Sequence, residues 1–386
     1  MNRSIIHIPD PSISYNCTPI PIIQLLSETY KDVHVYFVLI WCPIGVFSNI
    51  LNVVVLNQKS MQTPTNFLLT SLAISDGLIM FLYIPFTSYF IYGEHMTAAA
   101  YPMAIYLILY VNLQNLLHIF SCGIIVTLAV FRLIYAKYLL KCQEWCSHKR
   151  AVLAVGITLF TATFFTIPCI IGHRIFPVNE VLPEDGSTVA TDSALDTFDE
   201  RYMVNYVQSE WRRRLLYWNA AVIMKLAPLF CFIFLSSLLI ATMHARVRHA
   251  RSMSRQRFDR KNLPDHSLMS QVSSADATEN PLRRVNEADK IRERLHSRTT
   301  HLLLALMIIY ILAFIPQVIL LLMSFGMGIC FSETVYDPLG NLMDLLTLLS
   351  CGTNFWLYCI MSQQFRITFL KLFCPKRFSA KAENTQ

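Results

Sequence analysis

The chain has 386 residues, of which 54% are hydrophobic and only 15% are charged, and its formal net charge is +7. A soluble protein of this composition would expose a large apolar surface, so the composition excludes an ordinary soluble domain and indicates a polytopic membrane protein. The 11 cysteines are scattered and mostly lie in apolar segments, where cysteine behaves as a small hydrophobic residue. Their spacing indicates neither a disulfide framework nor a zinc site.

Residues 1–33 are polar and rich in Pro and Ser, and we expect them to form an extracellular tail without a cleavable signal peptide. Two N-glycosylation sequons begin at Asn2 and Asn16, and they have meaning only if this tail lies outside the cell. Asn16 is the better candidate, because Asn2 stands almost at the terminus.

Seven apolar segments follow, and each is long enough to span a bilayer as a helix. They are residues 34–57, 66–91, 101–135, 150–172, 217–244, 300–325 and 338–361. The sequence therefore predicts an all-α membrane fold, in which residues 34–361 form a seven-transmembrane helix bundle. Two long connections interrupt the series. Residues 173–216 form an acidic loop, and residues 245–299 form a basic loop whose middle, residues 265–280, is expected to be disordered.

The charges of the connections predict the orientation of the bundle. Seven crossings put the basic loop and the basic C-terminal segment on one side and the acidic loop on the other. The positive-inside rule then places the N-terminus outside and the C-terminus in the cytoplasm. We therefore expect a multi-pass protein of the plasma membrane, and the sequons agree with this orientation.

The last segment, residues 362–386, is expected to begin with a short amphipathic helix that contacts membrane lipid and to end as a cytoplasmic tail. Within residues 362–373, Phe365 and Phe369 share an apolar face, while the basic side chains face water. Cys374 follows this helix and is either a palmitoylation site or an unmodified thiol.

Polar side chains inside the predicted spans are the first functional signal, because such groups are costly in lipid and should face the bundle interior. They are Asn49, Asp76, Arg132, Lys225, Asp344 and Asn354. Prolines also interrupt the spans and free backbone groups that neighbouring helices must satisfy. They are Pro43, Pro85, Pro168, Pro228 and Pro316. Bent helices around a polar core suit a bundle that opens at one end.

The order and spacing of these residues resemble the class A, or rhodopsin-like, G-protein-coupled receptors, and the resemblance covers all seven spans. The matching motifs are Asn49, Leu72-Ala73-Ile74-Ser75-Asp76, Leu128-Ala129-Val130-Phe131-Arg132-Leu133, Pro228, Pro316, Asn354-Phe355-Trp356-Leu357-Tyr358 and Phe365-Arg366. No single motif is decisive, but together they are specific.

Departures from the family pattern narrow the resemblance. Phe131 replaces the acidic neighbour of the arginine, Phe355 replaces the proline of span seven, and Phe314 replaces the tryptophan of span six. Span three has no cysteine at its outer end, and residues 173–216 contain none, so the usual disulfide cannot form. This pattern is similar to invertebrate receptors for myosuppressin and FMRFamide-like peptides. Cys17 and Cys330 are the only outside cysteines in the predicted topology, and a bridge between them is a hypothesis.

The resemblance also implies roles for individual residues. Arg132 and Tyr358 would contact a heterotrimeric G protein, with arrestin as a further candidate partner. An activation switch would comprise Phe314, Pro316 and Asn354. A sodium ion would be bound by Asp76, Ser121, Ser350 and Asn354, and no other cofactor is expected.

The ligand class follows from residues that other branches of the family require. Span seven has no lysine for a retinal Schiff base, and Gln114 stands where amine receptors have an aspartate. A peptide is therefore favoured, and the acidic outer loops would attract a basic one. We expect Asp344 either to bind the arginine of an Arg-Phe-amide peptide or to pair internally with Lys225 or His118. The other expected ligand contacts are Gln114, Asn115, His118, Lys225 and Gln317.

Competing functions remain open within the membrane class. A chemosensory receptor for a small molecule would share the fold, and a ligand-independent membrane adaptor is the second alternative. The sequence shows no internal repeats of a transporter, no filter of a channel and no nucleophile–base set or phosphate loop of an enzyme. We expect no nucleic acid partner.

Overall fold

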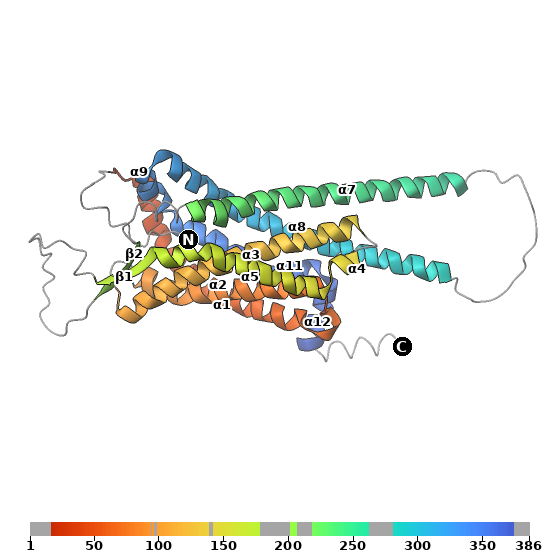
Figure 1. Ribbon diagram of the computed structural model, residues 1–386, viewed down its shortest axis with the longest axis horizontal. Coiled ribbons are helices and arrows are strands. Elements are labelled where there is room, and N and C mark those ends of the chain that lie inside the picture. The colour runs from red at the N-terminus through yellow and green to blue at the C-terminus, as the bar shows by residue number, and fades with distance from the viewer. Residues whose placement is uncertain are drawn as a thin grey trace, which may run out of the picture.

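The computed structural model describes residues 17–93, 95, 99–138, 142–177, 201–206, 218–261 and 281–373, and they form a bundle of long, roughly parallel helices (Figure 1). The long helices are α1 (Pro21–Leu56), α2 (Pro64–Phe86), α3 (Tyr101–Lys137), α5 (His148–Gly172), α7 (Ala227–Lys261) and α8 (Pro281–Met327). The shorter ones are α4 (Cys142–Trp145), α9 (Ile329–Phe331), α10 (Gly340–Gly352), α11 (Asn354–Met361) and α12 (Gln363–Phe373).

Length and composition make this bundle a membrane domain. Six of the described helices are long and apolar enough to cross a membrane, and a seventh span is counted when residues Gly340–Met361 are taken with the bent helix that follows. α12 leaves that span at 96°, so it lies across the bundle end rather than along it (Figure 1). The predicted seven-transmembrane fold with a short terminal helix is therefore confirmed.

Helix α3 runs through the centre of the bundle and packs against α2, α5, α7 and α8, while α10 packs against α1, α2 and α8. Large apolar side chains on the outside show where lipid would lie. Phe160 on α5 is 75% exposed and Phe230 on α7 is 69% exposed. Such an arrangement, apolar outside and polar within, is the reverse of a soluble bundle and follows from the absence of water around the spans.

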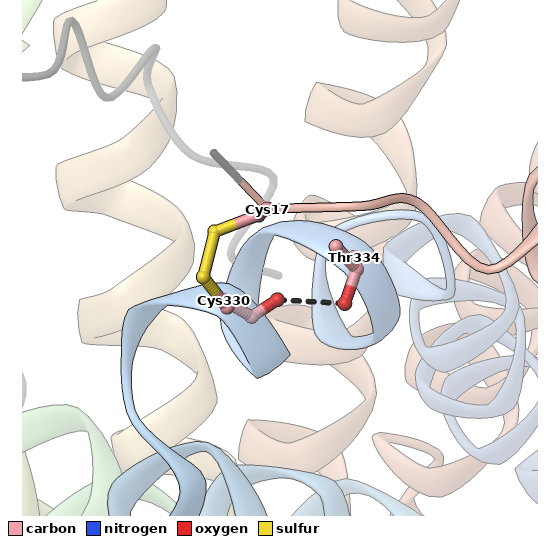
Figure 2. Close-up of a disulfide and its surroundings, with 3 residues drawn as sticks. All are labelled: Cys17, Cys330 and Thr334. Carbon is pink, nitrogen blue, oxygen red and sulfur yellow. Dashed lines mark hydrogen bonds between the residues drawn. A yellow bond between two sulfur atoms is a disulfide. The ribbon is translucent and has the colours of Figure 1, made fainter. Parts of the chain in front are cut away.

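A disulfide defines one end of the bundle. Cys17, which precedes α1, is joined to Cys330 of α9, and their Cα atoms are 5.3 Å apart (Figure 2). Thr334 lies one turn after Cys330, and its hydroxyl donates to the carbonyl of Cys330 at 2.6 Å. The structure thus brings together the two cysteines that the sequence singled out. We call this the disulfide end and the opposite end, which carries α12, the α12 end.

A two-stranded hairpin covers part of the disulfide end, and sequence analysis did not predict it. Strands β1 (His173–Pro177) and β2 (Tyr202–Tyr206) are antiparallel, and β2 also bridges to Ala99 just before α3. His173 donates from Nδ1 to the carbonyl of Cys169 at 2.7 Å, and burial lowers the pKa of this imidazole. The hairpin therefore joins the ends of α5 and α3 at the disulfide end.

Several element bounds differ from the expected ones. Helix α1 begins at Pro21, inside the segment expected to be a tail, because a proline fits the first turn of a helix. The helical ends of α7 and α8 occupy most of the expected basic loop, since α7 reaches Lys261 and α8 starts at Pro281. Residues 265–280, where disorder was expected, lie outside the described residues, as does most of the acidic loop.

The prolines of the spans are accommodated inside or beside helices. Pro43, Pro168 and Pro316 lie within α1, α5 and α8. The other two adjoin wide, π-helical turns. Pro85 precedes the turn η2 (Thr87–Tyr92), and Pro228 follows η4 (Asn219–Leu226). A π-helical turn absorbs the backbone mismatch that a proline creates and is frequent at functional sites.

Candidate functional site

The carboxylate of Asp76 lies at the centre of the bundle and is completely buried. Its oxygens accept hydrogen bonds from Ser121 at 2.8 Å, from Asn354 at 2.7 Å and from Tyr310 at 3.2 Å. These donors come from α3, α11 and α8, so one carboxylate on α2 connects four helices. A buried polar group of this kind must be hydrogen-bonded to be tolerated.

The same centre has the donor set that a small cation would require. Besides the Asp76 carboxylate and the Ser121 hydroxyl, the Oδ1 atom of Asn354 is buried and has no hydrogen-bond partner among the described residues. Ser350, which the resemblance also assigned to a sodium ion, instead donates to the carbonyl of Thr347 at 2.7 Å. Three of the four expected residues therefore meet through direct hydrogen bonds, and Ser350 is bonded to its own helix.

A second buried carboxylate, Asp344 on α10, lies nearer the disulfide end. It accepts a hydrogen bond at 3.0 Å from the hydroxyl of Tyr83 on α2. The oxygen of that hydroxyl lies 3.1 Å from Nε2 of His34 on α1. Because the tyrosine proton points to the carboxylate, the imidazole N–H is the donor to the tyrosine. A chain of hydrogen bonds thus runs from α1 through α2 to the carboxylate.

Aromatic side chains surround this carboxylate, and sequence analysis did not select them. Tyr110 on α3 stacks on Phe86 with 4.2 Å between ring centroids, and its buried hydroxyl has no hydrogen-bond partner in the described chain. Their spacing in the sequence from the selected polar residues could have identified them. Tyr83 follows Asp76 by two helical turns, and Tyr110 precedes Gln114 by one turn, so each lies on the inner face of its helix.

A third cluster comprises four residues, and we call it the Lys225 cluster: Lys225, Gln317, Phe314 and His118. Lys225 lies in the π-helical turn η4, donates from Nζ to Oε1 of Gln317 and sits 5.1 Å from the ring centroid of Phe314. The ring of His118 is 5.3 Å from the same phenylalanine ring. Three of the expected ligand contacts are therefore brought together.

The other two expected ligand contacts are directed at neighbouring helices. The amide of Gln114 is buried and donates to the carbonyl of Ile79 on α2 at 2.8 Å. The amide of Asn115 donates to the sulfur of Cys169 on α5 at 2.9 Å. Each side chain cross-links α3 to a neighbour.

A column of rings joins the Lys225 cluster to the central carboxylate. Phe314 and Tyr310 follow one another on α8 with 6.1 Å between centroids, and Phe232 of α7 packs 6.0 Å from each. The hydroxyl of Tyr310 ends the column at Asp76. Since the protein interior is close-packed, a displacement at Phe314 would be felt at the carboxylate.

Arg132 lies near the α12 end and is also buried. Its guanidinium lies 5.7 Å from the ring centroid of Tyr135, and no carboxylate of the described residues pairs with it. Arg246 of α7 donates to the carbonyl of Tyr135 at 3.1 Å, which brings α7 to the same place. The arginine, whose sequence neighbour is Phe131 rather than an acidic residue, therefore has its aromatic contact with Tyr135.

Tyr358 and Phe355 of α11 connect the last span to α12. Tyr358 is buried with its ring 5.4 Å from that of Phe365, and its hydroxyl has no hydrogen-bond partner among the described residues. The Phe355 ring packs edge-on against Phe365 at 6.0 Å and Phe369 at 5.8 Å. The residue that departs from the family proline is thus a packing contact for the terminal helix.

The expected modification sites Asn2, Asn16 and Cys374 lie outside the described residues. In the part of the chain that is described, no group of three or more His, Cys, Asp or Glu side chains could hold a metal ion. The cysteines Cys142 and Cys146 are both buried beside the α12 end, and burial raises the pKa of the Cys146 thiol to about 11.

Comparison with known proteins places these clusters in a family. The family model described as 7 transmembrane receptor (rhodopsin family) matches residues 48–358. The chain is 26% identical to the G-protein coupled receptor dmsr-1 of Caenorhabditis elegans, over 96% of this chain and 73% of that protein. It is 27% identical to the sex peptide receptor of Drosophila melanogaster, over 89% of this chain and 73% of that protein. The bovine thyrotropin-releasing hormone receptor is 28% identical over 43% of this chain and 40% of its own length.

Proposed function

Because the chain belongs to the rhodopsin family of seven-transmembrane receptors, whose members are receptors rather than enzymes, we propose that it binds an extracellular neuropeptide and activates a heterotrimeric G protein. The peptide class is supported by the relatives that align over most of this chain, one of which is named for a sex peptide. A small-molecule ligand has no comparable support, and a ligand-independent adaptor would have no use for buried charges near the disulfide end.

The proposal includes an orientation in the plasma membrane. The helical extensions of α7 and α8 lie beyond the bundle at the α12 end, and they carry much of the basic sequence (Figure 1). Basic connections remain on the cytoplasmic side. The disulfide end, with the hairpin and Cys17, then faces the outside and receives the ligand.

We propose that the ligand is an Arg-Phe-amide peptide and that Asp344 receives its arginine. The observation that carries this proposal is a carboxylate buried near the outer end and oriented by the hydroxyl of Tyr83. A guanidinium can donate two parallel hydrogen bonds to a carboxylate, and such pairs gain strength away from water. The neighbouring ring of Tyr110 offers a further surface on which a guanidinium can stack.

The signal would pass inward through the ring column. A ligand that moves Phe314 would disturb Tyr310 and thereby the hydrogen bonds at Asp76 and Asn354. We propose a sodium ion at Asp76, where it would supply a positive charge to the buried carboxylate in the resting state. At the α12 end, Arg132 and Tyr358 would be exposed to the G protein, and arrestin would compete for the same surface.

A double substitution cycle tests the ligand contact. The probe is a synthetic peptide that ends in Arg-Phe-amide, and the variant is Asp344→Asn. We expect the variant to lower peptide potency about 30-fold, as for loss of a charge-assisted bidentate pair of about 2 kcal/mol. A peptide with citrulline in place of the arginine should lose about the same potency on the wild type. On the variant it should lose little further potency, because the two changes remove one interaction.

Glu333→Gln is the matched control, because it removes a carboxylate from the same end in the turn η5 (Ser332–Tyr336). It should change potency less than about threefold, as expected for a distant charge that only steers the ligand. Antibody labelling of an N-terminal tag on intact cells controls for expression and reads the orientation. Unchanged potency of Asp344→Asn, with normal surface labelling, would contradict the proposed contact.

A further inference from the structure

The Lys225 cluster contains more hydrogen-bond donors than it uses. An ammonium group has three N–H donors. In the described part of the chain, the Nζ atom of Lys225 makes one hydrogen bond, to Gln317, and faces one aromatic ring, that of Phe314. Both direct contacts are electrically neutral, and the carboxylate of Asp344 attracts the ammonium through space. A positive charge within a membrane span is costly, so a lysine with neutral partners has capacity for an oxygen from outside the chain.

The lysine is held in place by a fixed partner. Gln317 donates with both hydrogens of its amide nitrogen, to the carbonyl of Met343 at 3.0 Å and to the hydroxyl of Thr347 at 2.8 Å. These two bonds determine which end of the amide is the oxygen, and that oxygen faces Lys225. The ammonium is therefore anchored to α8 and α10 through a neutral hydrogen-bond partner.

His118 supplies a second unused group beside the lysine. Its side chain is only 5% exposed, and its Nε2 atom has no hydrogen-bond partner among the described residues. The imidazole and the ammonium both lie against the ring of Phe314, at 5.3 Å and 5.1 Å. A buried group without a partner is unfavourable unless a ligand or water completes it. Two independent groups thus converge on one place.

Helix α10 gives the position of this cluster relative to Asp344. Gln317 bonds to the carbonyl of Met343, which precedes Asp344 in the chain, and to Thr347, which follows it by about one turn. The two partners of Gln317 thus lie on either side of Asp344 along α10, so the cluster lies beside the carboxylate. A ligand that offers a cation to Asp344 can present its next group to Lys225.

We propose that Lys225 and His118 form an inner subsite that binds an oxygen acceptor at the end of the ligand, either the carbonyl of a terminal amide or a terminal carboxylate. This inference rests on the proposed peptide function and specifies how the peptide is oriented. In a peptide that ends in Arg-Phe-amide, the arginine precedes the terminal residue, so the arginine at Asp344 leaves the terminal carbonyl for Lys225. Contact with Phe314 then couples occupancy of the subsite to the ring column.

The first test needs no agonist. Lys225→Met keeps the length of the side chain and removes the charge, and Lys225→Gln keeps a donor. We expect Lys225→Met to raise the melting temperature of the purified, ligand-free receptor, because a charge kept for binding is unfavourable in the empty protein. Lys59→Met, which removes an exposed lysine from the turn η1 (Lys59–Met61), should have no effect. A lower melting temperature of Lys225→Met that Lys225→Gln restores would overturn the inference, because the lysine would then be a structural donor to Gln317.

The second test compares two ligands on the same variants. The probes are a peptide ending in Arg-Phe-amide and the same peptide with a free carboxyl terminus. On Lys225→Met, the active peptide should lose at least about tenfold in potency, which is about 1.4 kcal/mol, while its dependence on Asp344 remains. A loss confined to the amide identifies the carbonyl, and a larger loss for the free acid identifies the carboxylate. Unchanged potency of both peptides would overturn the inference.

Should neither peptide activate the wild type, the proposed function fails and the inner subsite is still tested. The probes are then N-acetylphenylalanine and its amide, which present the same two acceptors without an arginine. At least one should raise the melting temperature of the wild type and leave that of Lys225→Met unchanged. Equal shifts in both proteins, or no shift in either, would overturn the subsite.

Discussion

At the scale of single residues, the chemistry of a buried group depends on which donors reach it. Asp76 and Asp344 are both buried carboxylates, yet one is held by three side-chain donors of α3, α8 and α11 and the other accepts from a tyrosine on α2. Their residue types and positions were predictable from the rule that charges in spans face inward. The family resemblance also predicted Ser121 and Asn354 beside Asp76, whereas Tyr310 and Tyr83 were not predicted, because they come from other helices.

Two buried tyrosines allow a controlled measurement of one hydrogen bond. Tyr310 donates to Asp76, whereas the hydroxyl of Tyr358 has no hydrogen-bond partner in the described chain. We expect Tyr310→Phe to destabilise the protein by about 1 kcal/mol, since a hydrogen bond inside a membrane protein contributes about that much. Tyr358→Phe should be neutral or stabilising, because it removes an unsatisfied hydroxyl. Thermal unfolding in detergent gives both values, and equal losses in the two variants would contradict this account.

At the scale of elements, the length of each apolar segment predicted the membrane spans. The residues at which the helices begin and end were predicted less well. The predicted position of each span was correct, because a helix needs about 20 apolar residues to cross a bilayer. Helix ends and the β1–β2 hairpin were missed, because backbone hydrogen bonds with neighbouring segments decide them. The Ala99 bridge to Tyr202 is an example, since it joins segments that are far apart in the sequence.

The junction between α11 and α12 yields a prediction about one element. Phe355→Pro restores the family residue in the first turn of α11, where a proline is tolerated by the backbone. It removes the ring that packs on Phe365 and Phe369, so we expect a loss of about 1–2 kcal/mol and weaker attachment of α12. Hydrogen exchange should accelerate in residues 363–373.

Trp356→Ala is the control for this change, because Trp356 is the adjacent aromatic residue and is half exposed on the lipid side of the helix. It should leave exchange in α12 unchanged. Equal acceleration in both variants, or in neither, would show that Phe355 does not hold the terminal helix.

At the scale of the whole molecule, one covalent bond connects the start of the first span to the segment between the last two. The Cys17–Cys330 bridge closes a loop with a sequence separation of 313 residues (Figure 2). Such a link restricts the unfolded chain and limits how far α1 can separate from α8 and α10 at the disulfide end. The cysteines of the usual family disulfide are missing from this sequence.

Removal of the bridge should therefore affect the whole fold. We expect Cys17→Ser, Cys330→Ser and the double variant to lose the same stability, about 2 kcal/mol or more, because each change removes one bond. Thermal unfolding with and without reductant measures the loss, and reductant should have no further effect on the variants. Cys231→Ser, which changes a half-buried free thiol, should be neutral. Additive losses in the single variants, or free thiols at both positions by mass mapping, would contradict the bridge.

The sequence by itself determined which segments leave water and which rare polar residues must point inward, and by the positive-inside rule it predicts which way the loops face. These properties are local, since they depend on the free energy of transferring each segment into lipid. Tertiary structure alone decided that Tyr310 joins Asp76 while Ser350 stays bonded to its own helix. It also decided that Gln114 and Asn115 turn to neighbouring helices and that Lys225 lies against Phe314. The physical reason is that hydrogen bonds and ring contacts between helices depend on their rotation and depth, which no single span specifies.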